Sequence, residues 1–281
     1  MPHMPGNTIT DSETTVLYLG SKKMKVYFGF DDTDDHDSPY GTGKLVRWFQ
    51  RKLPAECACL GVVRQQLFVS EGIPYTSHNS SACLIAEIPD TALLDGIITD
   101  AVAHIGKHAA SGSDPGLCVA TEMDTALDDL VEFGHHCTHT ISTQKAALEA
   151  ARTVHLSGHG GTNDGIIGAT AAVGLTLSGW AGRYVEFENL REWPAQTRVG
   201  DLRNRGIDTL SIDRDARIPS SEDIVHTHGW VRPRRVGHRP VLLVKPLGDC
   251  SWENIDHKRE KKVSLPLSDE GVPLVTAVSA S

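Results

Sequence analysis

Long apolar runs are missing from this 281-residue sequence, and none approaches the roughly 18 to 20 residues of a membrane span. We therefore expect no membrane partner. Residues 1–23 lack a basic start followed by an apolar stretch, which excludes a secretory signal, and we interpret them as a leader or expression remnant. The six cysteines form no CxxC pair and no disulfide framework, which favours a cytoplasmic location.

Basic residues are also scarce. Lysine and arginine together number 27 against 36 acids, giving a net charge of −9. A protein whose affinity depends on phosphate backbones usually has the opposite balance. The composition therefore disfavours broad coating of a nucleic acid, although a local basic groove is compatible with it.

Hydrophobic periodicity predicts strands at 25–30, 58–69, 82–88, 117–121, 183–188 and 240–245. Helices are predicted over 44–53 and 91–109, and two more within 125–154, where Ser142 and Thr143 are candidate N-caps. A glycine-rich loop from His155 leads into a helix of small residues. Strands and helices alternate irregularly, which favours an α+β fold with a mixed sheet.

The densest chemical signal follows the first predicted strand, in the segment GFDDTDDHD. Carboxylates at this density suit Mg²⁺, which typically takes one or two protein carboxylates together with substrate phosphates. The alternative is a solvated acidic turn. We expect the metal ligands to be Asp31, Asp32 and Asp34.

A helix start rich in glycine comes directly afterwards, at Gly41, Thr42, Gly43 and Lys44. Backbone N–H groups at a helix N-terminus and a lysine together can hold phosphate. The segment is not a Walker A loop, because Leu45 follows the lysine. We expect these four residues to bind ATP, with Lys44 as the catalytic cation that stabilises its phosphates.

The segment GHGGTNDGIIG offers a second glycine-rich turn before a helix. It can approach a ligand closely, or it can simply allow close helix packing. On the first interpretation, its ATP-binding residues are Asn163, Asp164, Gly165 and Gly168.

Histidines gather at His135, His136 and His139 around Cys137. A metal site completed by His155 and His159, ordinary polar loop residues, and a substrate or general-base role all remain open. Candidate substrate residues are His78, Asn79, His136 and His139. Arg232, Arg234, Arg235 and Arg239 could hold an anion or form a solvated face.

Taken in order, GFDDTD, the Ile73-Pro74-Tyr75 segment, DGIIGATAAVG and GHRPVLLVKPLG resemble the archaeal tRNA(Ile) 2-agmatinylcytidine synthetase family. The family counterparts run approximately as GIDDTDS, NPxIPYKTRGN, RGLIGALAAIG and GPDPVLYGIRG. This resemblance extends from about Met24 to Gly248. It implies a kinase-like, ATP-dependent catalytic domain at 24–188, a ferredoxin-like domain at 189–260 and a flexible tail at 261–281.

In that family, ATP activates a cytidine oxygen of tRNA, and the amine agmatine displaces it. The resemblance assigns Asp31, Asp32 and Asp34 to Mg²⁺-ATP, and Asp164, Gly165 and Gly168 to the second glycine segment. Two departures matter. Lys44 stands where the family has a phosphorylated threonine, and about 33 residues after Gly248 leave no room for the family's OB-fold and zinc ribbon.

The combined expectation is a Mg²⁺- and ATP-dependent, ligase-like enzyme. It would activate an acceptor oxygen by phosphoryl or nucleotidyl transfer for attack by an amine. We expect a small-molecule or peptide substrate, tRNA only through a partner protein, and allow for a homodimer. The alternatives are a tRNA cytidine-modifying enzyme that borrows its RNA-binding module, and a non-catalytic nucleotide-binding regulator.

Overall fold

The structure, a computed structural model, describes residues 23–73 and 78–256. The expected flexible tail and almost all of the expected leader lie outside the described residues. Residues 74–77, which include Pro74 and Tyr75 of the Ile73-Pro74-Tyr75 segment, also lie outside them. In the described part of the chain, no helix combines the length and the apolar character needed to cross a membrane.

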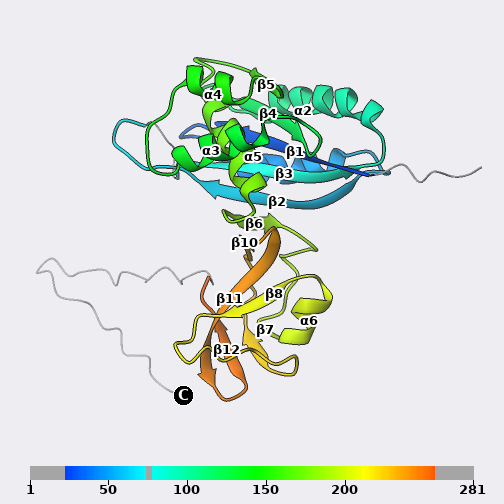
Figure 1. Ribbon diagram of the computed structural model, residues 1–281, viewed down its shortest axis with the longest axis vertical. Helices are drawn as coiled ribbons and strands as arrows, with labels where there is room; N and C mark the ends of the chain where they lie inside the picture. Colours follow the sequence, from blue (N-terminus) through cyan, green and yellow to red (C-terminus); the bar gives the residue numbers. More distant parts are fainter. Residues whose placement is uncertain (1–22, 74–77, 257–281) are drawn as a thin grey trace, which may run out of the picture.

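One twelve-stranded mixed sheet forms the framework, in the order β5-β4-β1-β3-β2-β6-β10-β11-β12-β9-β7, and β8 pairs with β11 (Figure 1). The strands are β1 (Met24–Asp31), β2 (Ala58–Gln66), β3 (Ser80–Ile88), β4 (Gly116–Thr121), β5 (His155–Gly158), β6 (Arg183–Glu186), β7 (Gln196–Arg198), β8 (Asp208–Ser211), β9 (Ile224–His226), β10 (Arg234–Val236), β11 (Arg239–Gly248) and β12 (Ser251–Asn254). The helices are α1 (Thr42–Phe49), α2 (Leu94–His108), α3 (Leu127–His136), α4 (Gln144–Ala150), α5 (Gly165–Ser178) and α6 (Val199–Asn204). Short 3₁₀ turns follow α1 at Gln50–Lys52 and precede α2 at Thr91–Leu93.

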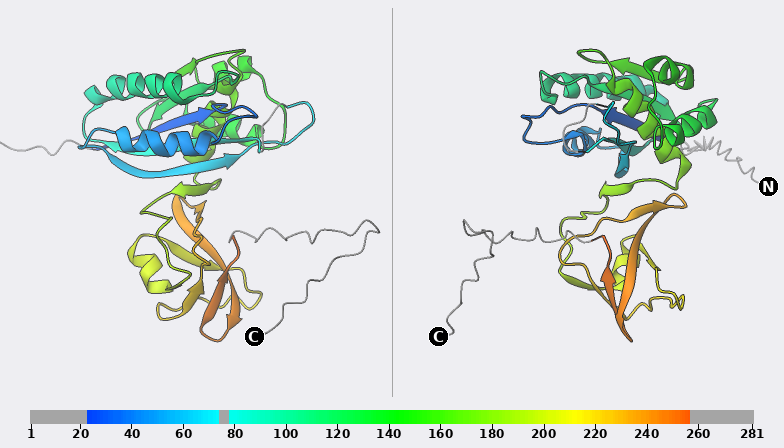
Figure 2. Two further views of the ribbon diagram at one scale, coloured as in Figure 1. Left: turned by 180° about the vertical axis from the view of Figure 1, so that it is seen from behind. Right: turned by 90° about the vertical axis from the view of Figure 1, so that its left-hand side faces the viewer.

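Helices cover both faces of the sheet around β1. Alternate residues of β1, namely Val26, Phe28 and Phe30, pack against α1 and α2. Tyr27 faces the core on the other side, which α3 and α5 cover. Figure 2 shows α1 and α2 together on the face opposite α3, α4 and α5. β1 is therefore buried on both faces, which explains its nearly continuous apolar sequence.

Helix α5 lies unusually close to the sheet because small residues line its contact face. A β-carbon added at Gly29 of β1 would stand 2.2 Å from the carbonyl oxygen of Ala169. A β-carbon at Gly116 of β4 would stand 2.2 Å from the carbonyl carbon of Gly165. Both values are far below any real contact, so the glycines on the strands and the start of α5 permit this packing.

The expected combination of helices and strands with a large mixed sheet is confirmed, and each strand and helix that the sequence predicted with explicit bounds is present. Thr143 is the N-cap of α4, and its side chain accepts a hydrogen bond from the N–H of Ala146 at 3.2 Å. Ser142 is not the cap, so that alternative is wrong. The stretch from His155 is also not all loop, because His155–Gly158 forms edge strand β5 beside β4. Four residues are too few for an alternating pattern to be recognised.

The sheet continues from the β1–β5 region into the C-terminal strands through β6 and β10, where Arg183 pairs with Arg234. Beyond that pairing, β7–β12 and α6 form the lower part of Figure 1. The junction is held by Arg235, whose guanidinium donates to the Thr176 carbonyl at 2.9 Å and the Tyr184 hydroxyl at 2.6 Å. The proposed boundary at 188/189, and the kinase-like and ferredoxin-like nature of the two parts, remain predictions.

Candidate functional site

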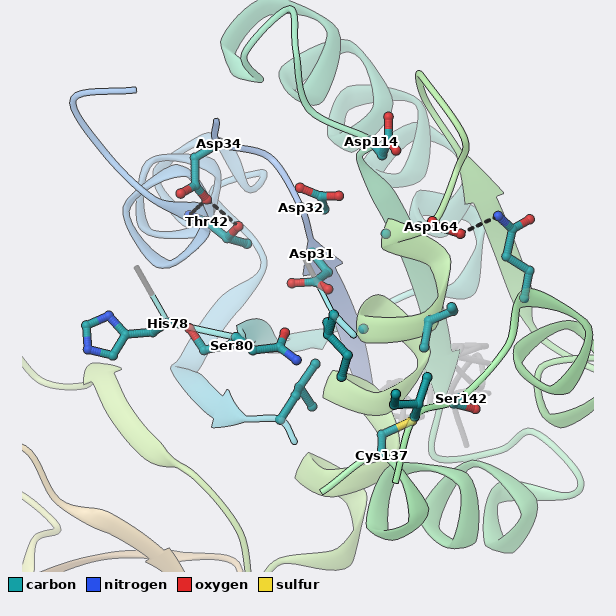
Figure 3. A pocket seen from close by; sticks show the side chains of 18 of the residues that line it. Asp31, Asp32, Asp34, Thr42, His78, Ser80, Asp114, Cys137, Ser142 and Asp164 are labelled. Carbon is teal, nitrogen blue, oxygen red and sulfur yellow. Dashed lines mark hydrogen bonds between the residues drawn. The ribbon is translucent and has the colours of Figure 1, made fainter. Parts of the chain in front are cut away.

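A cavity of about 700 Å³ opens where β1 ends and α5 begins. It brings together residues from β1 and the loop after it, from the segment before β4, and from the first turn of α5 (Figure 3). The residues expected from the sequence that line this cavity are Asp31, Asp32, Asp34, Thr42, His78, Asn79, Asp164, Gly165 and Gly168.

Asp31 is the last residue of β1 and lies against the first turns of α5. A β-carbon added at Gly168 would stand 1.7 Å from Oδ2 of Asp31. The carboxylate thus occupies the space that a side chain at position 168 would need. Burial and the neighbouring charge of Asp32 raise the pKa of Asp31 to about 8.

Asp32 follows Asp31 in the chain, but its backbone leaves the extended conformation of β1 and adopts a left-handed conformation with φ at 51°. Asp is among the few non-glycine residues that adopt this left-handed region readily. Burial, followed by the charges of Asp114 and Asp34, raises the pKa of Asp32 to about 6. Several carboxylates therefore share one side of the cavity, as Figure 3 shows, and repel one another there.

Asp34 connects the acidic loop to the start of α1. Its Oδ1 accepts hydrogen bonds from the backbone N–H of Thr42 at 3.1 Å and from the Thr42 hydroxyl at 3.2 Å. The hydroxyl of Thr33 also donates to that of Thr42, at 3.1 Å. Thr42 therefore anchors the loop, and one oxygen of Asp34 is engaged by the helix start.

Asp114 and Asp164 complete this side of the cavity. The acids Asp31, Asp32, Asp34, Asp114 and Asp164 are together called the acidic wall. The side-chain amide of Gln144, at the start of α4, donates to Asp164 at 2.6 Å. The hydroxyl of Thr162 donates to Asp114 at 2.5 Å. Sequence reasoning missed Asp114, because an isolated acid in a turn before a strand carries no signal of its own. Only the fold brings it to Asp32.

Lys44 does not line the large cavity. It lies in a smaller neighbouring cavity of about 230 Å³, together with Gly41 and Gly43. Its ammonium nitrogen stands 5.2 Å from the centre of the Trp48 ring and 5.5 Å from that of Tyr40. The expected ATP-binding residues are therefore divided between two adjoining cavities, and Asn163 lines neither.

The histidines at the end of α3 are not part of the cavity lining. His135, His136 and His139 are exposed, and of the four residues of this cluster Cys137 alone lines the cavity. The structure thus separates His136 and His139 from His78 and Asn79, with which the sequence grouped them as substrate residues. Across residues 23–73 and 78–256, no three His, Cys, Asp or Glu side chains are placed to hold a metal together.

That last observation bears on magnesium as well. The described carboxylates do not form a complete protein-only metal site. Mg²⁺ commonly binds through one or two carboxylates and completes its coordination with phosphate oxygens and water. The purely oxygen donor set of Asp31, Asp32 and Asp34 is therefore chemically suited to Mg²⁺ carried by a nucleotide.

The four arginines considered as an anion site are dispersed. Arg234 pairs with Asp256 at 3.0 Å, and Arg239 pairs with Asp208 at 2.8 Å. Arg235 is buried at the junction described above, and Arg232 is buried with its guanidinium 3.9 Å from the Trp230 ring centre. These contacts indicate structural roles.

Comparison with known proteins gives structural neighbours only. No family model matches the chain, and no curated protein matches it. Among solved structures, TiaS in complex with an isoleucine tRNA and ATP aligns at 23% identity and a TM-score of 0.46, covering 54% of this chain and 36% of that one. Apo TiaS, an agmatidine synthetase for that tRNA, aligns at 23% identity and a TM-score of 0.44, covering 54% of this chain and 35% of that one. A tRNA fluorescent labelling enzyme aligns at 24% identity and a TM-score of 0.45, covering 54% of this chain and 36% of that one.

These matches confirm the resemblance expected from the motifs, at the level of fold. The chain spans about a third of the length of those enzymes. They also correct one expectation. We expected a small-molecule or peptide substrate and tRNA only through a partner protein, whereas the structural neighbours include complexes with tRNA, so that expectation is wrong.

Proposed function

We propose that this protein is an ATP-dependent enzyme that activates an oxygen atom of a tRNA base for attack by a nucleophile. The observation that carries the proposal is the 700 Å³ cavity, in which acids from three separate segments face the glycine-containing start of α5. The order of the sequence motifs supports tRNA as the acceptor, because the family that these motifs resemble acts on tRNA. The proposed ligands are ATP, Mg²⁺ and tRNA.

The roles of the residues follow from their positions. Asp31 and Asp32 would hold the metal, with Asp34, which lines the same cavity, as a third candidate ligand. Magnesium, when bound, would neutralise the negative charge of the nucleotide phosphates. Gly165 and Gly168 present backbone without side chains, which lets a ligand approach the first turn of α5.

Two hydrogen bonds keep the acidic wall in place. Gln144 donates to Asp164, and Thr162 donates to Asp114, and each hydrogen bond favours the observed orientation of the carboxylate towards the cavity. Catalysis of phosphoryl transfer depends mainly on positioning and on stabilising charge. A wall of pre-oriented acids supports that kind of chemistry once a cation is bound.

The first test is ligand-induced stabilisation. Mg²⁺-ATP should raise the melting temperature, because a ligand at a hundred times its Kd adds about 2.7 kcal/mol to the free energy of unfolding. Excess EDTA should cancel the rise, and Mg²⁺ alone should give a smaller one. A protein that is stabilised by no Mg²⁺-nucleotide does not have the proposed function.

The second test is turnover. Release of ADP or AMP from labelled ATP should depend on added tRNA. A nucleotide-binding regulator would show the thermal shift without turnover, so the two measurements together distinguish an enzyme from a binding protein.

A further inference from the structure

A second, smaller cavity adjoins the acidic one and differs from it in charge. Its volume is about 230 Å³. It shares four lining residues with the large cavity, all labelled in Figure 3: Asp34, Thr42, His78 and Ser80. The remaining lining residues are Gly41, Gly43, Lys44 and Arg64.

Arg64 is the residue that sequence reasoning did not single out. It projects from β2 and is half-buried, and its Nε donates to the Ser80 hydroxyl at 2.9 Å. Among the described residues, no carboxylate lies within ion-pair distance of Arg64, and none accepts a hydrogen bond from its two terminal nitrogens. Arg183, its neighbour across β6, is paired with Asp256 at 2.9 Å.

The cavity therefore gathers positive charge beside a wall of negative charge. Lys44 likewise forms no ion pair with a described residue; its ammonium lies over two aromatic rings. Burial and the nearby Arg183 lower the pKa of Arg64, the direction expected where a cation lies in positive surroundings. The carboxylate that lines this cavity, Asp34, is engaged by the N–H and hydroxyl of Thr42.

We propose that Arg64, together with Lys44, holds a single phosphate group in this second cavity. A volume of about 230 Å³ is smaller than the roughly 300 to 1,000 Å³ of a site for a whole small molecule, but it is large enough for one phosphate. The planar guanidinium suits phosphate because its terminal nitrogens can donate two parallel hydrogen bonds.

This proposal rests on the proposed function for the source of the phosphate. A group in the small cavity would be continuous with a ligand in the large one, because the two share a wall at Ser80 and His78. The phosphate would belong either to the nucleotide or to the backbone of the RNA acceptor. Both sources present the same chemistry to Arg64.

The experiment compares Arg64→Gln with the wild type, using inorganic phosphate, Mg²⁺-ATP and a labelled single-stranded oligoribonucleotide as separate probes. Calorimetry measures phosphate and Mg²⁺-ATP, and fluorescence anisotropy measures the oligonucleotide. Arg198→Gln is the matched control, because it removes the same charge from an exposed side chain on β7. Arg64→Lys tests the need for the planar fork.

Arg64→Gln should weaken inorganic phosphate binding at least about tenfold, because it removes a positive charge and the charged donor of two parallel hydrogen bonds to the phosphate. Arg64→Lys should recover part of the loss, and Arg198→Gln should bind as the wild type does. A matching loss for Mg²⁺-ATP assigns the phosphate to the nucleotide. A loss for inorganic phosphate and the oligonucleotide, without a loss for Mg²⁺-ATP, assigns it to the acceptor.

Lys44→Gln provides a second variant, because it changes an exposed side chain on α1 and should not disturb folding. It should weaken the same probe as Arg64→Gln. If Arg64→Gln folds and binds all three probes as the wild type does, the proposal is wrong. A wild type that binds phosphate but not Mg²⁺-ATP would overturn the proposed function and leave the phosphate site standing.

Discussion

Gly168 and Asp31 occupy adjoining space, such that a β-carbon at position 168 would stand 1.7 Å from Oδ2 of the carboxylate. The helix that carries Gly168 and the strand that ends at Asp31 are far apart in sequence, and this contact limits where the carboxylate can lie in the cavity lining. The glycine is thus needed for the position of an acid as well as for helix packing.

Gly168→Ala should therefore destabilise the protein and impair nucleotide binding. The added methyl group must displace Asp31 or push α5 away from β1, and overpacking of this kind costs about 1–3 kcal/mol. Urea denaturation should show that loss, and the thermal shift with Mg²⁺-ATP should shrink.

Gly96→Ala is the matched control, because Gly96 lies inside α2 and a β-carbon there would meet nothing within 4 Å. Alanine should stabilise that helix by about 0.5–1 kcal/mol relative to glycine. Equal effects of the two substitutions would contradict the Gly168–Asp31 contact.

Asp32→Asn separates stability from binding. At neutral pH the substitution removes one of several mutually repelling charges, and asparagine also adopts the positive φ of this position, 51°. The unliganded protein should be as stable as the wild type or slightly more stable. Mg²⁺-ATP binding should weaken at least about tenfold, because Mg²⁺ sites depend on very few protein carboxylates.

The control for this change is Asp37→Asn, whose side chain in the same acidic segment is fully exposed at 100%. It should alter neither melting temperature nor nucleotide binding. An early-melting Asp32→Asn that still binds Mg²⁺-ATP would mean that the acid has a structural role only.

Local patterns were enough to predict the strands and helices around the site. In β1, the alternating residues Val26, Phe28 and Phe30 are those that face one core. In α5, small residues occupy almost every position because the helix is buried on nearly all sides. The acidic segment, placed immediately after a strand, was also sufficient to single out Asp31, Asp32 and Asp34, which line one cavity. Their role as metal ligands remains a prediction.

Residues that reach the site only through tertiary structure could not be predicted. Asp114 is an isolated acid, and it approaches Asp32 because β4 pairs with β1. Lys44 was expected to stabilise the phosphates of ATP next to the acids, and the sequence did not show that α1 places it over Trp48 in a second cavity, which Asp34 also lines. Arg64 was hidden within a strand, where it follows the apolar pair Val62 and Val63 and belongs to no recognisable motif.

Arg235→Met should destabilise the junction between α5, β6 and β10. The guanidinium is 5% exposed and donates to the carbonyl oxygens of Thr176 and His238 and to the Tyr184 hydroxyl. Methionine would fill much of the volume but leave these acceptors without their donor, a loss of about 2–4 kcal/mol. Denaturant midpoints measure this loss.

Arg239→Gln is the control, because the side chain of Arg239 is 70% exposed and forms an ion pair on the surface. The expected loss is below about 1 kcal/mol. If instead Arg235→Met matched the control, the buried hydrogen bonds at the junction would not stabilise the fold.

His104 should make the stability of the α1–α2 side depend on pH. The ring is 1% exposed, its Nε2 lies 3.0 Å from the Leu45 carbonyl oxygen, and its Nδ1 has no partner among the described residues. Burial lowers the pKa of His104 to about 4, and nearby Lys52, His108 and Lys107 act in the same direction, while the Leu45 contact opposes them.

Because this folded-state pKa lies below the ordinary value of 6.5, the unfolded chain binds the proton more readily than the folded one. The contribution of His104 to stability is therefore complete above pH 6.5 and is lost as the pH falls from 6.5 towards 4. Between pH 7 and pH 5 the loss should be about 1–2 kcal/mol. His104→Gln keeps a donor for the Leu45 carbonyl without a titrating group, so urea midpoints of the two proteins at both pH values isolate the effect from the other titrating residues. The wild type should lose more stability than the variant over this interval, and parallel curves would show that His104 is not held neutral by its burial.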